Sequence, residues 1–203
     1  MTKKRSKNVN KKEKNFLFEN YKKSWRYLNE SKNYIFIVIG LFILFLLMGF
    51  ISPIFFADKI TEMVKGLLNR FAGVSGLKLV WMIFANNVNA SLFGLVFGLF
   101  LGIFPVILTV VNGYLVGFVS NKVVSEVGYT SLWRLLPHGI FELPAVFISF
   151  GLGIKLGMFI FDKKPGKELL YRIKGSLRVI LFIILPLLFI AAVIEGVLIS
   201  FFS

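Results

Sequence analysis

The sequence predicts an all-α, polytopic membrane helix bundle with about five transmembrane helices and additional interfacial amphipathic helices. The first observation is composition: 57% of the 203 residues are hydrophobic and only 17% are charged, whereas soluble domains average about 25% charged residues. The second is distribution, because the charges gather between long apolar runs. The mean hydropathy of +0.79 agrees, and the length suits one compact helical domain.

Five apolar runs are long enough, or nearly so, to cross the hydrocarbon core of a bilayer. Pro53 follows the first run, and only Pro105 separates the second from the third. No small-residue cleavage pattern follows the first run, so we expect it to be retained. The expected spans are about 34–51, 79–104, 106–119, 138–161 and 177–200.

The distribution of Lys and Arg fixes the number of crossings. Eleven of them precede Tyr34 and six lie between the fourth and fifth runs, but only four and two lie in the segments after the first and third runs. Segments rich in Lys and Arg stay in the cytoplasm. An even number of crossings must therefore separate the two basic segments, so runs two and three are separate spans. We expect a multi-pass plasma-membrane protein with a cytoplasmic N-terminus and an external C-terminus.

Three amphipathic stretches border the spans, at residues 18–28, 60–71 and 169–177, and each is typical of a helix lying in the membrane interface. We therefore divide the chain into a basic cytoplasmic segment with an interfacial helix, residues 1–33, and one membrane domain, residues 34–203. The net charge is +14. Because the charges flank apolar runs, they predict contact with anionic lipid on the cytoplasmic side and not with nucleic acid.

Small residues recur every four positions in the second and fourth spans and once in the third. Such ridges let helix backbones approach closely in lipid. They predict that spans two to four form a tight unit with the first span at its periphery, although the same ridges also suit a homo-oligomer. The residues are Ala90, Gly94, Gly98, Gly102, Gly113, Gly117, Ala145, Ser149, Gly153 and Gly157.

Polar side chains gather in the outer half of the expected bundle. The only histidine and a carboxylate are four residues apart, on one face of the fourth span. An ionisable group in lipid needs a partner, so this candidate polar cluster either locks the helices together or lines a pocket. It comprises His138, Glu142, Asn87, Asn112, Arg134 and Glu195. Lys155 lies toward the inner end of the fourth span, where we expect it to snorkel.

The sequence offers little for catalysis or metal binding. It has no cysteine and one histidine, so thiol chemistry and a metal site with several imidazole ligands are excluded. It carries no G-x-S-x-G, H-E-x-x-H or phosphate-binding loop. We expect no enzymatic activity, no metal and no cofactor.

The central part of the chain resembles a known membrane family. The resemblance rests on Asn87, the following glycine ridge, the Asn112-Gly113 pair and the element Pro137-His138-Gly139-x-Phe141-Glu142-Leu143. Over about residues 79–157 these features are similar to the stage II sporulation protein M family. In spore formers, the namesake belongs to a complex that remodels septal peptidoglycan, while partners supply the wall-degrading chemistry. Because the family extends to archaea without peptidoglycan, the resemblance implies an integral membrane subunit and not sporulation itself.

Three functions compete. The first is a non-catalytic scaffold or subunit of a membrane- or envelope-remodelling complex with membrane or envelope protein partners. The second is a transporter or a lipid- or solute-binding protein that uses the cluster around His138 and Glu142, although no inverted repeat is evident. The third, and the least favoured, is an intramembrane enzyme with one of those two residues as acid or base.

Overall fold

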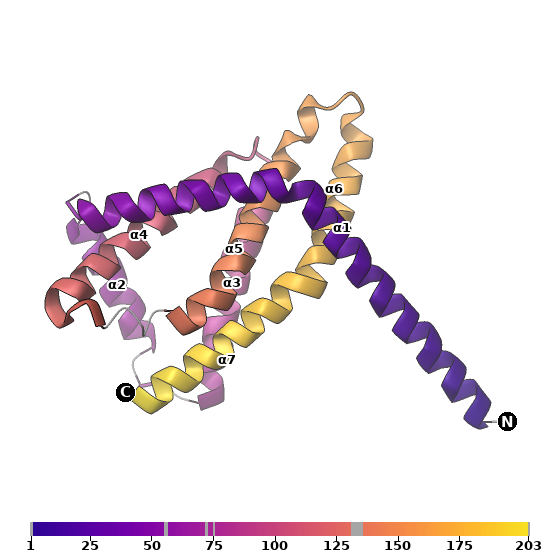
Figure 1. Ribbon diagram of the computed structural model, residues 1–203, viewed down its shortest axis with the longest axis horizontal. Coiled ribbons are helices and arrows are strands. Elements are labelled where there is room, and N and C mark those ends of the chain that lie inside the picture. The colour runs from indigo at the N-terminus through magenta and orange to yellow at the C-terminus, as the bar shows by residue number, and fades with distance from the viewer. Residues whose placement is uncertain (1, 55–56, 72, 75, 131–135, 203) are drawn as a thin grey trace.

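The computed structural model describes residues 2–54, 57–71, 73–74, 76–130 and 136–202 (Figure 1). Within these ranges the chain is helical and contains no strand, which confirms the all-α class. A four-residue 3-10 turn, η2 (Met158–Phe161), follows helix α5 (Leu136–Gly157), and a π-helical turn, η3 (Ile180–Ile184), precedes helix α7 (Leu185–Phe202). The helices are α1 (Thr2–Ile51), α2 (Ala57–Phe71), α3 (Gly76–Phe97), α4 (Ile103–Val127), α5 (Leu136–Gly157), α6 (Pro165–Val179) and α7 (Leu185–Phe202).

Five helical segments among the described residues are long and apolar enough to cross a membrane, which confirms the expected architecture. The third is longer than the sequence indicated, and the fifth begins earlier because α6, η3 and α7 run on from one another. The segments are Phe16–Ile51, Gly76–Phe97, Ile103–Val127, Gly139–Phe161 and Pro165–Leu198.

The second and third spans are separate helices, but Pro105 does not divide them as predicted. Residues 98–102 form the turn, with left-handed backbone at Leu101 (φ 57°) and Gly102 (φ 71°). Pro105 lies inside the first turn of α4, where its missing N–H would have no helical partner in any case. The proline is therefore compatible with the start of α4, and the glycine-containing turn makes the boundary.

The first span is not peripheral, so that expectation was wrong. α1 lies along α4 (Figure 1). Gly113 and Gly117 of α4 face the backbone of α1, and a Cβ atom on Gly113 would lie 2.7 Å from the carbonyl oxygen of Phe42. A Cβ atom on Gly49 of α1 would lie closer still to the backbone of Tyr114. The small ridge of the third span thus serves contact with the first span.

α3 and the turn after it meet α5 along a second backbone contact, which we call the glycine seam. It consists of Gly94 of α3 and Gly98 of the turn against Gly153 and Gly157 of α5. A Cβ atom on Gly98 would lie 2.6 Å from the Cα atom of Gly153, and one on Gly153 would lie 2.6 Å from the carbonyl oxygen of Gly94. Above the seam, Ser149 is buried and donates a hydrogen bond of 2.6 Å to the carbonyl oxygen of Ser91.

Two members of the expected ridges differ in role from the rest. Ala90 is exposed, and the buried line of α3 instead passes through Asn87, Ser91 and Gly94 and continues to Gly98 in the turn. A strict four-residue step advances about 400° around a helix, so it drifts some 40° per step away from a straight contact. Gly102 packs at the turn, where a Cβ atom would lie 3.0 Å from the Cα atom of Ile154.

The predicted boundary between residues 33 and 34 falls inside α1, which continues through it without a break. Figure 1 shows α1 bending so that its N-terminal part leaves the bundle. We call residues 16–33 the arm. The predicted third interfacial stretch also forms part of a longer helical run, because α6 passes through η3 into α7. Pro186 cannot donate the normal helical hydrogen bond, and the π-helical turn ends two residues before it.

Candidate functional site

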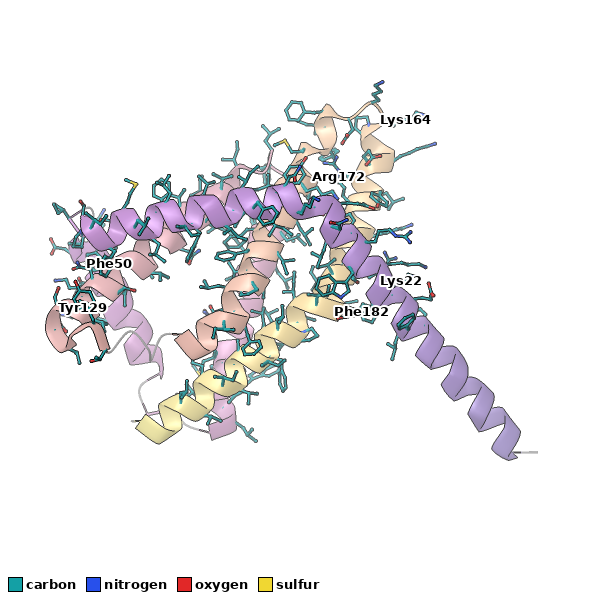
Figure 2. The ribbon with its side chains drawn as sticks, viewed as in Figure 1. Lys22, Phe50, Tyr129, Lys164, Arg172 and Phe182 are labelled. Carbon is teal, nitrogen blue, oxygen red and sulfur yellow. The ribbon has the colours of Figure 1, made fainter. Side chains whose placement is uncertain are left out.

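Several described charged side chains gather where the arm, the end of α5 and α6 meet. Figure 2 shows Arg172 beside the bend of α1. Two cations are buried here, Lys155 and Arg172, each with a relative exposure of 7%. We call the group the elbow cluster and define it as Tyr27, Glu30, Ser31, Lys155, Asp162, Glu168, Tyr171 and Arg172.

Arg172 joins α6 to the end of α5. Its Nη2 atom donates to Oδ2 of Asp162 at 2.5 Å, and its Nη1 atom donates to the carbonyl oxygen of Lys155. Its Nε atom lies 3.9 Å from a carboxylate oxygen of Glu168. A guanidinium next to the last carbonyl groups of a helix satisfies acceptors that have no intrahelical donor and complements the helix dipole.

Lys155 joins α5 to the arm. Its Nζ atom donates to Oγ of Ser31 at 2.9 Å and lies 3.9 Å from the centre of the Tyr27 ring. The Glu30 carboxylate is 4.0 Å away. Ser31 in turn donates to the carbonyl oxygen of Tyr27 at 2.7 Å. The ammonium group therefore has a hydroxyl, an aromatic face and a carboxylate around it, which is how a desolvated cation is stabilised.

Further contacts join the arm to α6 along its length. The hydroxyl of Tyr27 donates to the carbonyl oxygen of Arg172 at 3.2 Å, and that of Tyr171 donates to Glu30 at 2.6 Å. Nearer the N-terminus, Nε of Arg178 donates to Oδ1 of Asn20 at 3.0 Å. Gly175 fits under the Tyr27 ring, where a Cβ atom would lie 2.6 Å from it. These contacts set the direction of the arm.

The chemistry of the elbow cluster is that of a clamp. The two cations are buried while their acidic partners Glu30, Asp162 and Glu168 are a third or more exposed, so the carboxylates face water and the positive groups face the protein. In the part of the chain that the structure describes, no three His, Cys, Asp or Glu side chains gather to hold a metal ion. The cluster is suited to fixing helices relative to one another.

Sequence reasoning missed this cluster. Lys155 was expected to snorkel, which is wrong, because its ammonium group is buried against the arm. Arg172 falls in the amphipathic stretch 169–177, which was expected to lie in the membrane interface, yet its side chain is buried in the protein. A signal was present: a lysine inside an apolar run needs an acidic partner, and Glu30 lies just before the first span.

The predicted outer cluster falls partly outside the described residues. That holds for Arg134 and for the side chain of His138. Glu142 on α5 and Glu195 on α7 are half-buried. Asn87 is buried on α3, where its Oδ1 atom accepts a hydrogen bond of 3.5 Å from the amide of Asn86.

The position of Asn112 argues against its membership of the predicted cluster. Its side chain is exposed on α4, and its amide donates to the carbonyl oxygen of Leu108 at 2.7 Å, within its own helix. The structure therefore does not support a place for Asn112 in a cross-helix cluster. A coupling of His138 with Glu142 stays a prediction.

An apolar groove runs between the start of α3 and α7. Its volume is about 630 Å³, and its walls include Val80, Trp81, Phe84, Phe189 and Val193. Almost all of its lining is hydrocarbon and aromatic surface, so the groove suits an acyl chain or an apolar side chain and not an ion.

Comparison with known proteins now identifies the family. The model of the stage II sporulation protein M family matches residues 35–198, which is most of the chain. The chain belongs to the stage II sporulation protein M family. The matched region includes Lys155 and Arg172, whereas Tyr27, Glu30 and Ser31 of the arm precede it.

Among curated proteins, an uncharacterized protein of the archaeon Methanocaldococcus jannaschii is 28% identical over 145 residues, which cover 68% of this chain and 62% of that relative. The chain therefore spans less than two thirds of the length of the curated relative that it matches. No solved structure matches the chain.

Proposed function

We propose that this stage II sporulation protein M family member is a non-catalytic membrane subunit that organises a membrane- or envelope-remodelling complex. The observation that carries the proposal is the elbow cluster, in which Lys155 and Arg172 fix the arm to the bundle. Buried charges of this kind hold a defined arrangement of helices. A rigid membrane body with a projecting, charged arm is suited to holding partners.

The test is affinity purification of the tagged full chain from its native membranes. A scaffold retains the same membrane or envelope partners in fixed stoichiometry through detergent washing. A matched pair of variants sharpens the result: Arg172→Met should lose partners, because it frees the arm, whereas Lys174→Met, on the exposed side of α6, should retain them. Recovery of the chain without any fixed partner would contradict the scaffold role.

We place the chain in the plasma membrane with the arm and the segment between α5 and α6 in the cytoplasm. The support is the eleven and six basic residues in these regions. Because the chain has no cysteine, single cysteines at Lys164 and Lys59 report each side to an impermeant thiol reagent. We expect labelling from outside at Lys59 and protection at Lys164.

A lipid- or solute-binding function is the second candidate, and the groove between α3 and α7 favours it. Val80→Trp or Val193→Trp would fill the groove and should remove co-purifying lipid seen by native mass spectrometry. Val111→Trp, on an exposed side of α4, is the control. Lipid retention unchanged by filling the groove would leave the scaffold as the sole proposal.

The pair His138 and Glu142 supplies a separate test of the same choice. If the pair locks helices, His138→Ala and Glu142→Ala lower thermal stability, and their effects are not additive. If the pair lines a pocket, stability is retained while binding or transport is lost. Additive and silent substitutions at both positions would remove the pair from either function.

A further inference from the structure

The arm has three distinct sides. Ser24, Tyr27, Leu28 and Ser31 are buried against the rest of the protein. Next to this buried side lies an apolar side that the protein leaves uncovered: Phe18, Tyr21 and Trp25 are 66%, 46% and 53% exposed. At 100° per residue these three side chains fall within about 60° of one another, and the Tyr21 and Trp25 rings meet edge to face.

The third side is charged. Lys22, Lys23 and Arg26 are exposed and follow the apolar side around the helix. Figure 2 shows Lys22 on the arm, away from the helix bundle. In the printed sequence, eleven Lys and Arg precede Tyr34 against three Glu. The neighbouring turn before α6 adds the exposed Lys163 and Lys164. An apolar strip beside a basic strip is the pattern of a helix lying in the headgroup region of a bilayer.

Contacts on the buried side of the arm also keep its apolar side exposed on the surface of the protein. The elbow cluster and the bond from Arg178 to Asn20 fix the buried side against α6. The exposed aromatic side chains therefore cannot turn inward to hide from water. The same helix continues without a break into residues 34–51, where Phe36 and Ile37 are exposed.

We propose that the arm is a preformed binding surface for anionic lipid. Phe18, Tyr21 and Trp25 enter the boundary between headgroups and acyl chains, and Lys22, Lys23 and Arg26 bind lipid phosphates and acidic headgroups. The proposal does not depend on the scaffold role. Charge complementarity decides the occupant: a basic strip selects anionic lipid over zwitterionic lipid, and each Lys or Arg near such a surface changes the binding constant about fivefold.

Spin-label accessibility tests the placement. In the cysteine-free full chain, single spin labels at Phe18, Tyr21, Trp25, Lys22 and Arg26 are measured in nanodiscs containing phosphatidylglycerol. We expect the first three labels to be more accessible to oxygen, which concentrates in the bilayer, than to a water-soluble nickel chelate. The last two labels should be more accessible to the nickel chelate. Preference for nickel at all five positions would overturn the proposal. So would low access of both reagents at the first three, because a protein partner or second copy would then cover that side.

Lipid selection is tested by fluorescence quenching. Trp81→Phe and Trp133→Phe leave Trp25 as the only tryptophan of the three. In nanodiscs of phosphatidylglycerol and phosphatidylcholine, one lipid at a time is brominated. We expect brominated phosphatidylglycerol to quench Trp25 more strongly than the same fraction of brominated phosphatidylcholine. Equal quenching in this otherwise unaltered chain would overturn the anionic selection.

Charge-matched variants complete the test. Lys22→Gln, Lys23→Gln and Arg26→Gln together should bring the two lipids to equal quenching, at about a fivefold loss of preference per charge. Lys59→Gln, Lys65→Gln and Lys78→Gln together, all exposed and outside the arm, should leave the preference intact. A preference that survives the arm variant, or that the control variant removes, would contradict the proposal. Helical content and thermal stability of both variants verify that the fold is retained.

Discussion

The glycine seam and the elbow cluster both hold α5 in the molecule, and they do so by opposite means. At the seam, Gly98 and Gly153 carry no side chain, so α5 touches α3 and the turn after it through backbone atoms. At the elbow, Lys155 and Arg172 carry the longest side chains available, and each bridges two helices. Where water is absent, helices associate either through close packing or through paired polar groups.

This difference indicates which feature of the structure the glycine seam and the elbow cluster each control. Close backbone contact tolerates almost no added volume but has little directional chemistry, so the seam sets a distance. The elbow cluster depends on named donors and acceptors, so it sets a direction, that of the arm. Variants of the first kind should therefore abolish packing, and variants of the second kind should release the arm from an otherwise intact bundle.

The largest effect is expected at the seam. Gly98→Leu or Gly153→Leu would force α3 and α5 apart and lower the free energy of unfolding by about 3 kcal/mol or more. Gly40→Leu is the control, since nothing lies within 4 Å of a Cβ atom there. Thermal unfolding in detergent measures all three. Equal losses at the three glycines would show that the seam is not a special contact.

The second largest effect is expected at the elbow. Arg172→Met removes the partner of Asp162 and of the Lys155 carbonyl, and breaking a buried ion pair costs about 3 kcal/mol. Because Asp162 is one third exposed, water relieves part of this cost, and about 2 kcal/mol is the expected loss. Lys174→Met, exposed on the same helix, should lose less than about 0.5 kcal/mol. A similar loss for both variants would show that the elbow cluster makes no special contribution to stability.

A third comparison lies within α1 alone. Gly49→Ala places a methyl group against the backbone of Tyr114, whereas Gly40→Ala meets nothing within 4 Å. We expect a loss of about 1–3 kcal/mol at Gly49 and a small gain at Gly40, because alanine favours the helix by up to about 1 kcal/mol. The same thermal measurement applies. A gain at both positions would mean that α1 does not lie against α4 as described.

The smallest effect concerns a single hydrogen bond. Ser149→Ala removes the bond to the carbonyl oxygen of Ser91 between α5 and α3, and such bonds contribute about 0.6 kcal/mol in membrane proteins. Asn112→Ala is the control, because its bond stays within α4. We expect a measurable loss for the first variant and none for the second. The reverse order would restore Asn112 to a cross-helix cluster.

Much of the fold was accessible from the sequence because apolar length and charge distribution report directly on membrane spans. The glycine ridges were visible for the same reason, as small residues at a regular spacing. The spacing did not reveal which helix each ridge contacts. Gly113 and Gly117 face α1, and this pairing depends on the rotation of each helix about its axis, which cannot be inferred from the spacing alone.

The elbow cluster was hidden by sequence distance. Tyr27 and Arg172 are 145 positions apart, and Lys155 is isolated within an apolar run, so nothing local indicated that they meet. The opposite case is the other end of α5, where His138 and Glu142 were noticed because they are close in sequence; their coupling stays a prediction. Spacing along one helix predicts a shared face but not what another helix brings to it.

The central claim is that the elbow cluster fixes the arm relative to the bundle, and an electron–electron distance measurement tests it most directly. Spin labels replace the exposed Lys22 on the arm and the exposed Val111 on α4 in the full chain in nanodiscs. We predict one narrow distance distribution, which Arg172→Met broadens and Lys174→Met leaves unchanged. A broad distribution in the unaltered chain, or one that Arg172→Met does not change, would contradict the claim.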